Sequence, residues 1–163
     1  MKYLIYAFSL FLFCLVASCG TTEIKTIRTA SVEMIEEYPM EGSNTLTGIW
    51  KVDLNGINIE DIKSAKVTAI TLKMQEPSTS DLLAEITMQL AATGSDMQRV
   101  GILNPVPVEK KELYFTIAAE QENLLDLLMQ EEITFVADVN LQEDLVAALS
   151  VTTEIEIELE VKQ

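Results

Sequence analysis

The chain has 163 residues, 48% of them apolar, and a formal net charge of -15 because 26 acidic residues outnumber 11 basic ones. A chain this acidic repels phosphate backbones and anionic lipid surfaces, which excludes nucleic acid as an expected partner. The apolar residues recur in short blocks, so the composition favours a folded domain over a disordered acidic chain.

The residue types that are missing exclude several kinds of chemistry. The sequence contains no histidine and only two cysteines, Cys14 and Cys19. Ser-His-Asp and Cys-His nucleophiles and histidine-containing zinc sites therefore cannot form. Neither GxGxxG nor GxxxxGK[ST] occurs, so nucleotide binding has no sequence motif. We expect a protein that is not an enzyme, with no catalytic residues and no cofactor.

The first element along the chain is a leader over residues 1–18. It carries one basic residue, Lys2, and no acidic residue, and residues 3–14 are almost entirely apolar. A basic start followed by an apolar run is typical of a secretory signal peptide. The run is shorter than the roughly 20 apolar residues that span a bilayer, which disfavours a retained membrane anchor.

An apolar residue and two small ones, Val16, Ala17 and Ser18, lead into Cys19. This segment resembles the lipobox of bacterial lipoproteins. The resemblance implies that the chain is cut before Cys19, that the Cys19 sulfur is diacylated, and that the new amino group can be acylated too. Ordinary secretion, with a cut near Ala17 or Ser18 and a free thiol at Cys19, is the alternative.

A lipid anchor determines where the protein resides. Each buried methylene contributes about 0.8 kcal/mol, so two or three acyl chains hold a protein on the membrane permanently. Gly20 stands where an aspartate would, in the enterobacterial sorting pattern, retain a lipoprotein in the inner membrane. We therefore expect the outer membrane with the domain facing the periplasm, and surface exposure as the alternative. The expected partners are the membrane, through the anchor, and an envelope protein or glycan.

After a lipidated N-terminus and short tether over residues 19–25, residues 26–163 are expected to form a single domain. Its dominant pattern alternates apolar and polar residues, as in half-buried strands. Strands are expected near 26–36, 46–54, 66–74, 83–93, 113–117, 133–139 and 151–161. Seven or eight short strands without long crossover helices predict an all-β fold, an antiparallel β-sandwich.

Finer expectations concern short helices and the faces of strands. Asn123 is placed to cap a helix over 124–129, and residues 59–65 and 143–149 are expected to form a turn or two of helix. Thr68, Ile70, Leu72 and Met74 share one face of their strand in simple alternation. Trp50 falls on the apolar side of its strand, which predicts a core position.

One segment resembles a cation site. It places five oxygen-bearing side chains within nine residues: Asp53, Asn55, Asn58, Glu60 and Asp61. The spacing fails the EF-hand pattern, because the sixth position is Asn58 where that loop requires glycine. Asn55-Gly56 is itself a signal for a tight turn. A structural turn is the favoured interpretation, and a divalent cation site is the alternative.

The last strand carries a ladder of four carboxylates, Glu154, Glu156, Glu158 and Glu160. Alternate residues of a strand lie about 6.6 Å apart on one face, so these charges need opposite charges on neighbouring strands. Lys73, Lys110 and Lys111 are candidate partners. A solvated outer face is favoured over a surface for a basic partner or cations.

Three classes of function follow from these residues. A lipid-anchored, non-catalytic structural or binding module is favoured. A carrier or assembly factor that holds a lipid or hydrophobic peptide would require a large apolar cavity between the sheets. A carboxylate-based hydrolase would require a cleft with two acids whose pKa is raised.

Overall fold

The computed structural model describes residues 21–163, so the leader, the lipobox and Cys19 lie outside the described residues. Residues 21–163 form ten strands and three short helices. The strands are β1 (Thr22–Arg28), β2 (Val32–Glu36), β3 (Gly42–Lys51), β4 (Ile62–Met74), β5 (Leu83–Ala91), β6 (Gln98–Leu103), β7 (Glu112–Tyr114), β8 (Thr116–Ile117), β9 (Glu132–Leu141) and β10 (Leu149–Lys162). The helices are η1 (Ile59–Asp61), η2 (Pro77–Leu82) and α2 (Leu125–Leu128).

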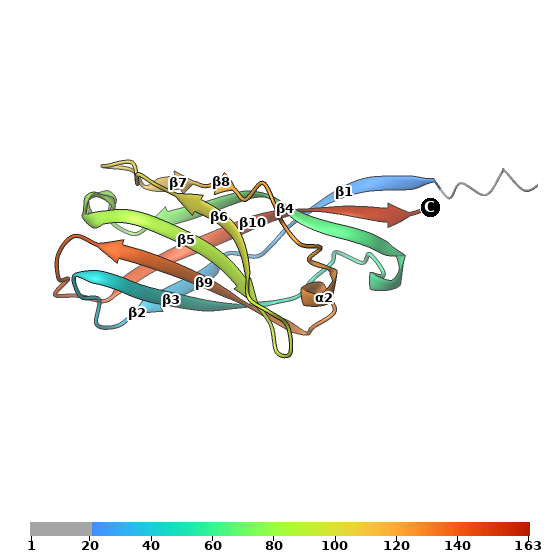
Figure 1. Cartoon of the computed structure of the whole chain (residues 1–163), viewed down its shortest axis with the longest axis horizontal. Coiled ribbons are helices and arrows are strands. Elements are labelled where there is room, and N and C mark those ends of the chain that lie inside the picture. Colours follow the sequence, from blue (N-terminus) through green and yellow to red (C-terminus); the bar gives the residue numbers. More distant parts are fainter. Residues whose placement is uncertain (1–20) are drawn as a thin grey trace, which may run out of the picture.

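All strand pairs are antiparallel, in the order β7-β4-β10-β2-β3-β9-β5-β6-β8, and β1 also pairs with β10. The sheet folds over on itself (Figure 1). Its two ends meet at residues 112–117, where β7 pairs with β4 and β8 pairs with β6. The predicted all-β, antiparallel β-sandwich is confirmed, with ten strands in the described part of the chain where seven or eight were expected.

The long strand β10 organises one layer. It pairs along its length with β4 on one side, and on the other side with β2 and then β1. The opening strand expected over 26–36 is therefore two strands. At the break between them, the Thr29 N–H donates to the Ile155 carbonyl at 2.9 Å, and the Thr29 hydroxyl accepts from the Ile155 N–H at 3.0 Å.

The expected tether over residues 19–25 is shorter in the structure. Residues Thr22 to Lys25 pair with β10 from Lys162 back to Leu159, so they belong to β1 and not to a connector. Backbone pairing with a strand end explains the difference, because β10 extends far enough to offer partners as far as Thr22. The first described strand thus begins three residues after Cys19.

The expected inward face of β4 needs one correction, at Thr68. The pairing of β4 with β10 shifts register between Glu156 and Ile157, which lie opposite Ala69 and Val67. This irregularity leaves Thr68 exposed, while Val67 and Ile70 are both buried. An extra residue in a strand interrupts the period of two, which simple alternation does not anticipate.

The short elements depart most from expectation. Residues 143–149 form bends and the start of β10 instead of a helix. Within residues 59–65, only Ile59–Asp61 form a short 3-10 turn, and β4 begins at Ile62. The helix near Asn123 is confirmed as α2, and the Asn123 side chain accepts hydrogen bonds from the N–H groups of Leu125 and Ala65. β6 was not predicted, because Gly101 interrupts its apolar pattern.

The layers enclose one continuous hydrophobic core. Trp50 is 3% exposed and packs against Phe135 with 6.3 Å between the ring centroids, which confirms its predicted core position. Large side chains from both layers fill the interior, among them Met34, Leu46, Ile70, Leu72, Ile86, Met88 and Leu90.

The molecule is elongated along its strands, and its two described termini meet at one end (Figure 1). The Gln163 N–H donates to the Thr21 carbonyl at 3.0 Å. We call this the terminal end. Across residues 21–163, none of the helices has the length and apolar character needed to cross a membrane.

Candidate functional site

A polar hollow of about 250 Å³ lies on the outer face of the layer formed by β1, β10, β4 and β7. We call it the outer-face cradle. Its lining residues are Arg28, Ala69, Thr71, Lys73, Glu112, Tyr114, Glu154 and Glu156.

Strand register brings these side chains together from four strands. Arg28 on β1 lies directly opposite Glu156 on β10, and Thr71 on β4 lies between Glu154 on β10 and Tyr114 on β7. Alternate residues of each strand point inward and form the core. The outward side chains of adjacent strands therefore form one continuous polar surface.

The cradle is held by charge-assisted hydrogen bonds. The Glu154 carboxylate accepts from Lys73 Nζ at 2.8 Å and from Ser31 Oγ at 2.7 Å. The Arg28 guanidinium pairs with Glu156. These contacts fix the cradle's charged groups in place, because hydrogen bonds between ionised groups are stronger than neutral ones.

Four cradle groups have displaced pKa values. The hydrogen bond from Lys73, and then that from Ser31, lowers the pKa of Glu154. The same contact raises the pKa of Lys73, and the hydrogen bond and charge of Glu156 raise that of Arg28. Tyr114 donates to Glu112 at 2.7 Å, and this bond and the carboxylate charge raise the tyrosine pKa.

This arrangement is suited to recognition. It presents fixed donors and acceptors beside the Tyr114 ring, whose residue is 64% exposed. A flat aromatic face next to paired polar groups can pack on a partner and hydrogen-bond to it. The lowered pKa of Glu154 is the opposite of what a general acid requires.

Three of the four carboxylates in the β10 ladder form ion pairs within the sheet. Glu154 pairs with Lys73, as predicted, while Glu156 pairs with Arg28, and Glu158 pairs with Lys66 at 2.9 Å. Glu160 accepts from Ser64 Oγ at 3.1 Å. The other two candidate lysines, Lys110 and Lys111, belong to the loop between β6 and β7.

The five candidate cation residues lie on the connection from β3 to β4. Asp53 Oδ1 accepts from the Asn55 N–H at 2.8 Å, and Asn55 has a φ of 54° in the turn that Gly56 continues. Asn58 accepts from the Glu60 N–H and so caps η1, which includes Glu60 and Asp61. Turn and capping contacts account for Asp53, Asn55 and Asn58.

Within residues 21–163, no three or more histidine, cysteine, aspartate or glutamate side chains are grouped so that they could hold a metal ion. The divalent cation site over Asp53 to Asp61 stays a prediction, as the alternative to the turn.

Sequence reasoning did not identify the cradle. The ladder glutamates and Lys73 were recognised, but Arg28, Glu112 and Tyr114 were not. Their outward positions could be inferred from alternation, whereas their proximity depends on β1 and β7 joining the layer of β4 and β10. Strand order is set by the whole fold, so the local sequence carries no signal for it.

No protein family and no curated protein matches the sequence. Solved structures with some likeness include FLHE, at 10% identity over 82% of this chain and 97% of that chain with a TM-score of 0.28. A carbohydrate-binding module from the β-sandwich superfamily gives 10% identity over 83% of this chain and 56% of that chain, with a TM-score of 0.35. Desmodium yellow mottle tymovirus gives 8% identity, 91% of each chain and a TM-score of 0.28. Similarity this low carries no functional argument.

The ion pair at the centre of the cradle gives a pH-dependent prediction. Glu154→Gln is expected to lower the free energy of unfolding by about 1 kcal/mol at pH 7, the size of a partly exposed, hydrogen-bonded pair. The folded-state pKa of Glu154 is lowered, so its contribution is present above the unfolded pKa of about 4.3 and is lost as pH falls through the folded pKa.

Urea denaturation of both proteins from pH 7 down to about pH 3 measures this difference. The matched control is Glu132→Gln, at an exposed position on β9, and we expect it to change stability little at any pH. A Glu154→Gln penalty that is equally large at both ends of the pH range would contradict the assigned ion pair.

Proposed function

We propose that this protein is a lipid-anchored component of the bacterial cell envelope and that its β-sandwich is a non-catalytic binding module. The observation that carries the proposal is the position of β1. It begins at Thr22, three residues after Cys19, and lies at the end of the molecule where the chain also finishes (Figure 1). Three extended residues span about 10 Å, so acyl chains on Cys19 would hold this end beside the bilayer.

The acidic composition supports attachment through the acyl chains alone. With a net charge of -15, the protein gains nothing from an anionic lipid surface. The proposed location is the outer membrane with the domain facing the periplasm, as Gly20 favours, and surface exposure is the alternative.

The packed interior favours a module that binds at its surface over a carrier. Lipid-sized and drug-sized ligands need cavities of roughly 300 to 1,000 Å³. The space between the layers is occupied by side chains that are almost fully buried, such as Met34, Leu46 and Ile86. The outer-face cradle instead offers exposed polar groups, for which an envelope protein or glycan is the proposed partner.

Cell fractionation with Cys19→Ser tests the proposal. The wild-type protein is expected in the membrane pellet, extractable only with detergent, because its acyl chains anchor it. Cys19→Ser removes the acylated sulfur, so the variant is expected to lose its lipid anchor. Removal of the leader before residue 19 is also expected to differ from that of the wild type. Immunoblots of the soluble and membrane fractions measure both results.

Cys14→Ser is the matched control, because Cys14 lies within the apolar run of the leader and would leave with it. It is expected to fractionate like the wild type. Binding is tested on the same cells by crosslinking the envelope and purifying the protein. The module proposal fails if no protein or glycan is recovered above the Cys19→Ser level, and the anchor proposal fails if Cys19→Ser stays in the membrane fraction unchanged.

A further inference from the structure

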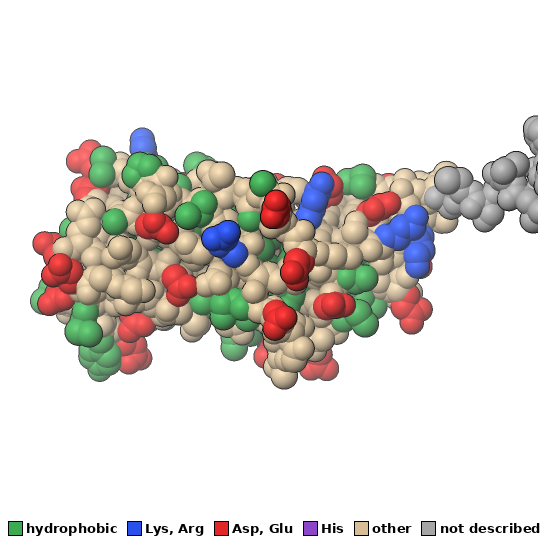
Figure 2. Space-filling view, in the orientation of Figure 1, with side chains coloured by type: hydrophobic (Ala, Val, Ile, Leu, Met, Phe, Trp, Pro, Cys, Tyr) green, Lys and Arg blue, Asp and Glu red, His purple; other side chains and the backbone are tan. Residues whose placement is uncertain are grey.

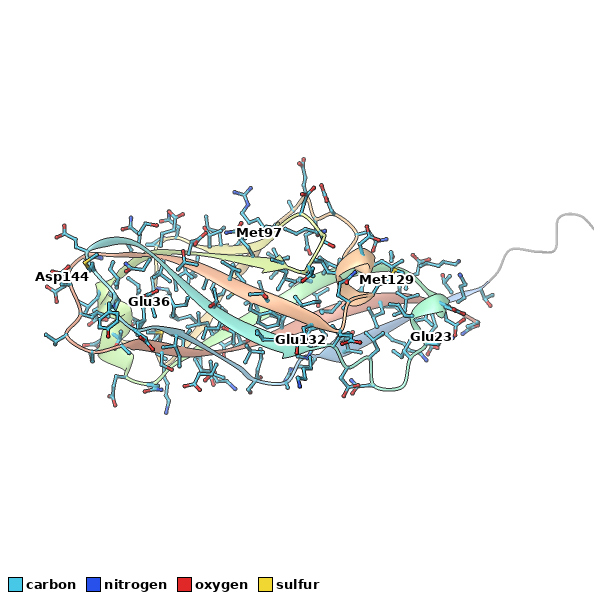
Figure 3. The ribbon with its side chains drawn as sticks, turned by 90° about the horizontal axis from the view of Figure 1, so that it is seen from below. Glu23, Glu36, Met97, Met129, Glu132 and Asp144 are labelled. Carbon is cyan, nitrogen blue, oxygen red and sulfur yellow. The ribbon has the colours of Figure 1, made fainter. Side chains whose placement is uncertain are left out.

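The end of the molecule opposite the terminal end exposes large apolar side chains. Four segments meet there, residues 36–41, 75–82, 104–111 and 142–148, and we call them the distal tip. Tyr38 is 80% exposed, Met40 is 66% exposed and Val146 is fully exposed. Figure 3 shows Glu36 and Asp144 at this end and Glu23 toward the other.

Hydrogen bonds donated by backbone N–H groups join two of these segments. The Leu145 N–H donates to the Pro39 carbonyl at 3.1 Å, and the Glu41 N–H donates to Asp144 Oδ1 at 2.7 Å. Tyr38, Met40 and Val146 therefore lie on two loops that are fixed to each other. Their exposed side chains are thus carried by one hydrogen-bonded pair of loops at the same end of the molecule.

The other two segments are fixed to the same end. The Glu109 N–H donates to Asp81 Oδ1 at 2.6 Å, and the Lys110 N–H donates to Ser80 Oγ at 3.2 Å. The Gln142 N–H donates to the Leu82 carbonyl at 2.9 Å. All four segments thus form one connected surface.

A hollow of about 280 Å³ opens beside Val146. Its walls include Met74 and Thr79 on one side, and Leu145, Val146 and Ala148 on the other. The hollow is large enough to receive one apolar side chain of a partner, which is the usual form of an anchor residue in a protein interface.

Charge at the tip restricts what can dock there. The four segments carry three, two, one and two carboxylates in chain order, against only two basic residues, Lys110 and Lys111. Figure 2 shows acidic and hydrophobic side chains together at the left end of the molecule. A second copy would bring two acidic tips together, and anionic lipid would repel the tip, so both are disfavoured.

We propose that the distal tip docks a protein whose contact surface places lysine or arginine side chains around an apolar anchor residue. The anchor residue occupies the hollow beside Leu145 and Val146, and the basic side chains face the tip carboxylates. The inference rests on the proposed function for its setting, because anchoring at Cys19 holds the terminal end at the membrane and directs the tip toward other envelope proteins.

Site-specific photo-cross-linking in living cells tests this inference. A photoreactive benzoylphenylalanine replaces Met40 or Val146 in the full-length protein, and the cross-linked segment is identified by mass spectrometry. Met129 is the matched control position, since it is 63% exposed against 66% for Met40 but follows α2, away from the tip. We expect an adduct from both tip positions, to a segment with lysine or arginine beside an apolar residue, and none from Met129.

Charge reversal tests the proposed chemistry. Glu37→Lys with Glu143→Lys, both at exposed positions, is expected to reduce the adduct about tenfold, because the complementary charges no longer attract. Glu131→Lys with Glu132→Lys is the control of equal charge and is expected to leave the adduct unchanged. Thermal melts of both double variants establish that each is folded.

Several results would overturn the inference: no adduct at the tip, equal adducts at Met129, adducts to lipid or to a second copy, or an adduct insensitive to charge reversal. Fractionation of the same cells shows whether a negative result concerns the docking surface or the lipid anchor of the proposed function. A protein found outside the membrane fraction contradicts the anchor, whereas an anchored protein without tip adducts contradicts only the docking surface.

Discussion

Replacing Phe135 with alanine is expected to lower the free energy of unfolding by about 3 to 5 kcal/mol, the usual cost of removing a large aromatic side chain from a packed core. Phe135 is 1% exposed and lies on β9, where it pairs with Gly48 of β3 and Leu90 of β5. The substitution would open a cavity in the core beside β9, and it would remove the ring contact with Trp50.

Urea denaturation followed by tryptophan fluorescence measures this loss. Trp50 is the single tryptophan of the chain, and its ring lies beside the substituted residue, so its emission reports directly on this part of the core. Ile49→Ala is the control, because Ile49 is 61% exposed on the same strand as Trp50 and should cost less than about 1 kcal/mol. Equal losses in the two variants would contradict the assigned core.

Gly48→Ala is expected to destabilise the protein by about 3 kcal/mol, although alanine is normally preferred to glycine within a strand. A Cβ at this position would lie 2.4 Å from the Glu33 carbonyl oxygen and 2.6 Å from Val32 Cγ1. The nearest atom belongs to the backbone of β2, which is held by its pairing with β10, so it cannot move aside without disturbing that layer.

Gly101→Ala is the informative comparison. Its nearest contact would be Ile70 Cδ1 at 2.8 Å, the flexible end of a side chain, so we expect a loss of only about 1 kcal/mol. Chemical denaturation of the two variants under one set of conditions ranks them. A Gly48→Ala protein as stable as the wild type would show that β2 and β3 do not approach each other as closely as described.

The sequence predicts most strands correctly where alternation is regular. β10 has buried residues from Val151 to Val161 at every second position, and β3 buries Leu46 and Trp50 as expected. These strands each have one face in the core and one outside, so the period of two is fully expressed in the residue types.

Alternation fails where the backbone departs from regular pairing. Thr68 sits at an irregularity that no residue type marks, and Thr29 interrupts the opening strand while preserving hydrogen bonds to Ile155. β6 was missed because Gly101 interrupts its apolar pattern, and the glycine lies close to the Ile70 and Phe115 side chains. Each of these features is determined by neighbouring strands and not by the local sequence.

The same reason explains why the cradle and the tip could not be predicted. Arg28 and Glu156 are 128 residues apart in sequence, and Pro39 and Leu145 belong to loops at opposite ends of the chain. Both surfaces depend on the order of strands in the sheet. By contrast, a lipobox is read from contiguous residues, so the anchor could be proposed from sequence alone.

Intact-mass analysis of the protein purified from its native membrane tests the central claim most directly. The account predicts a chain that begins at Cys19 and carries the added mass of a diacylglyceryl group, with or without a further acyl chain on the new amino group. A mass corresponding to a free thiol at Cys19, or to a chain with the leader still attached, would contradict it.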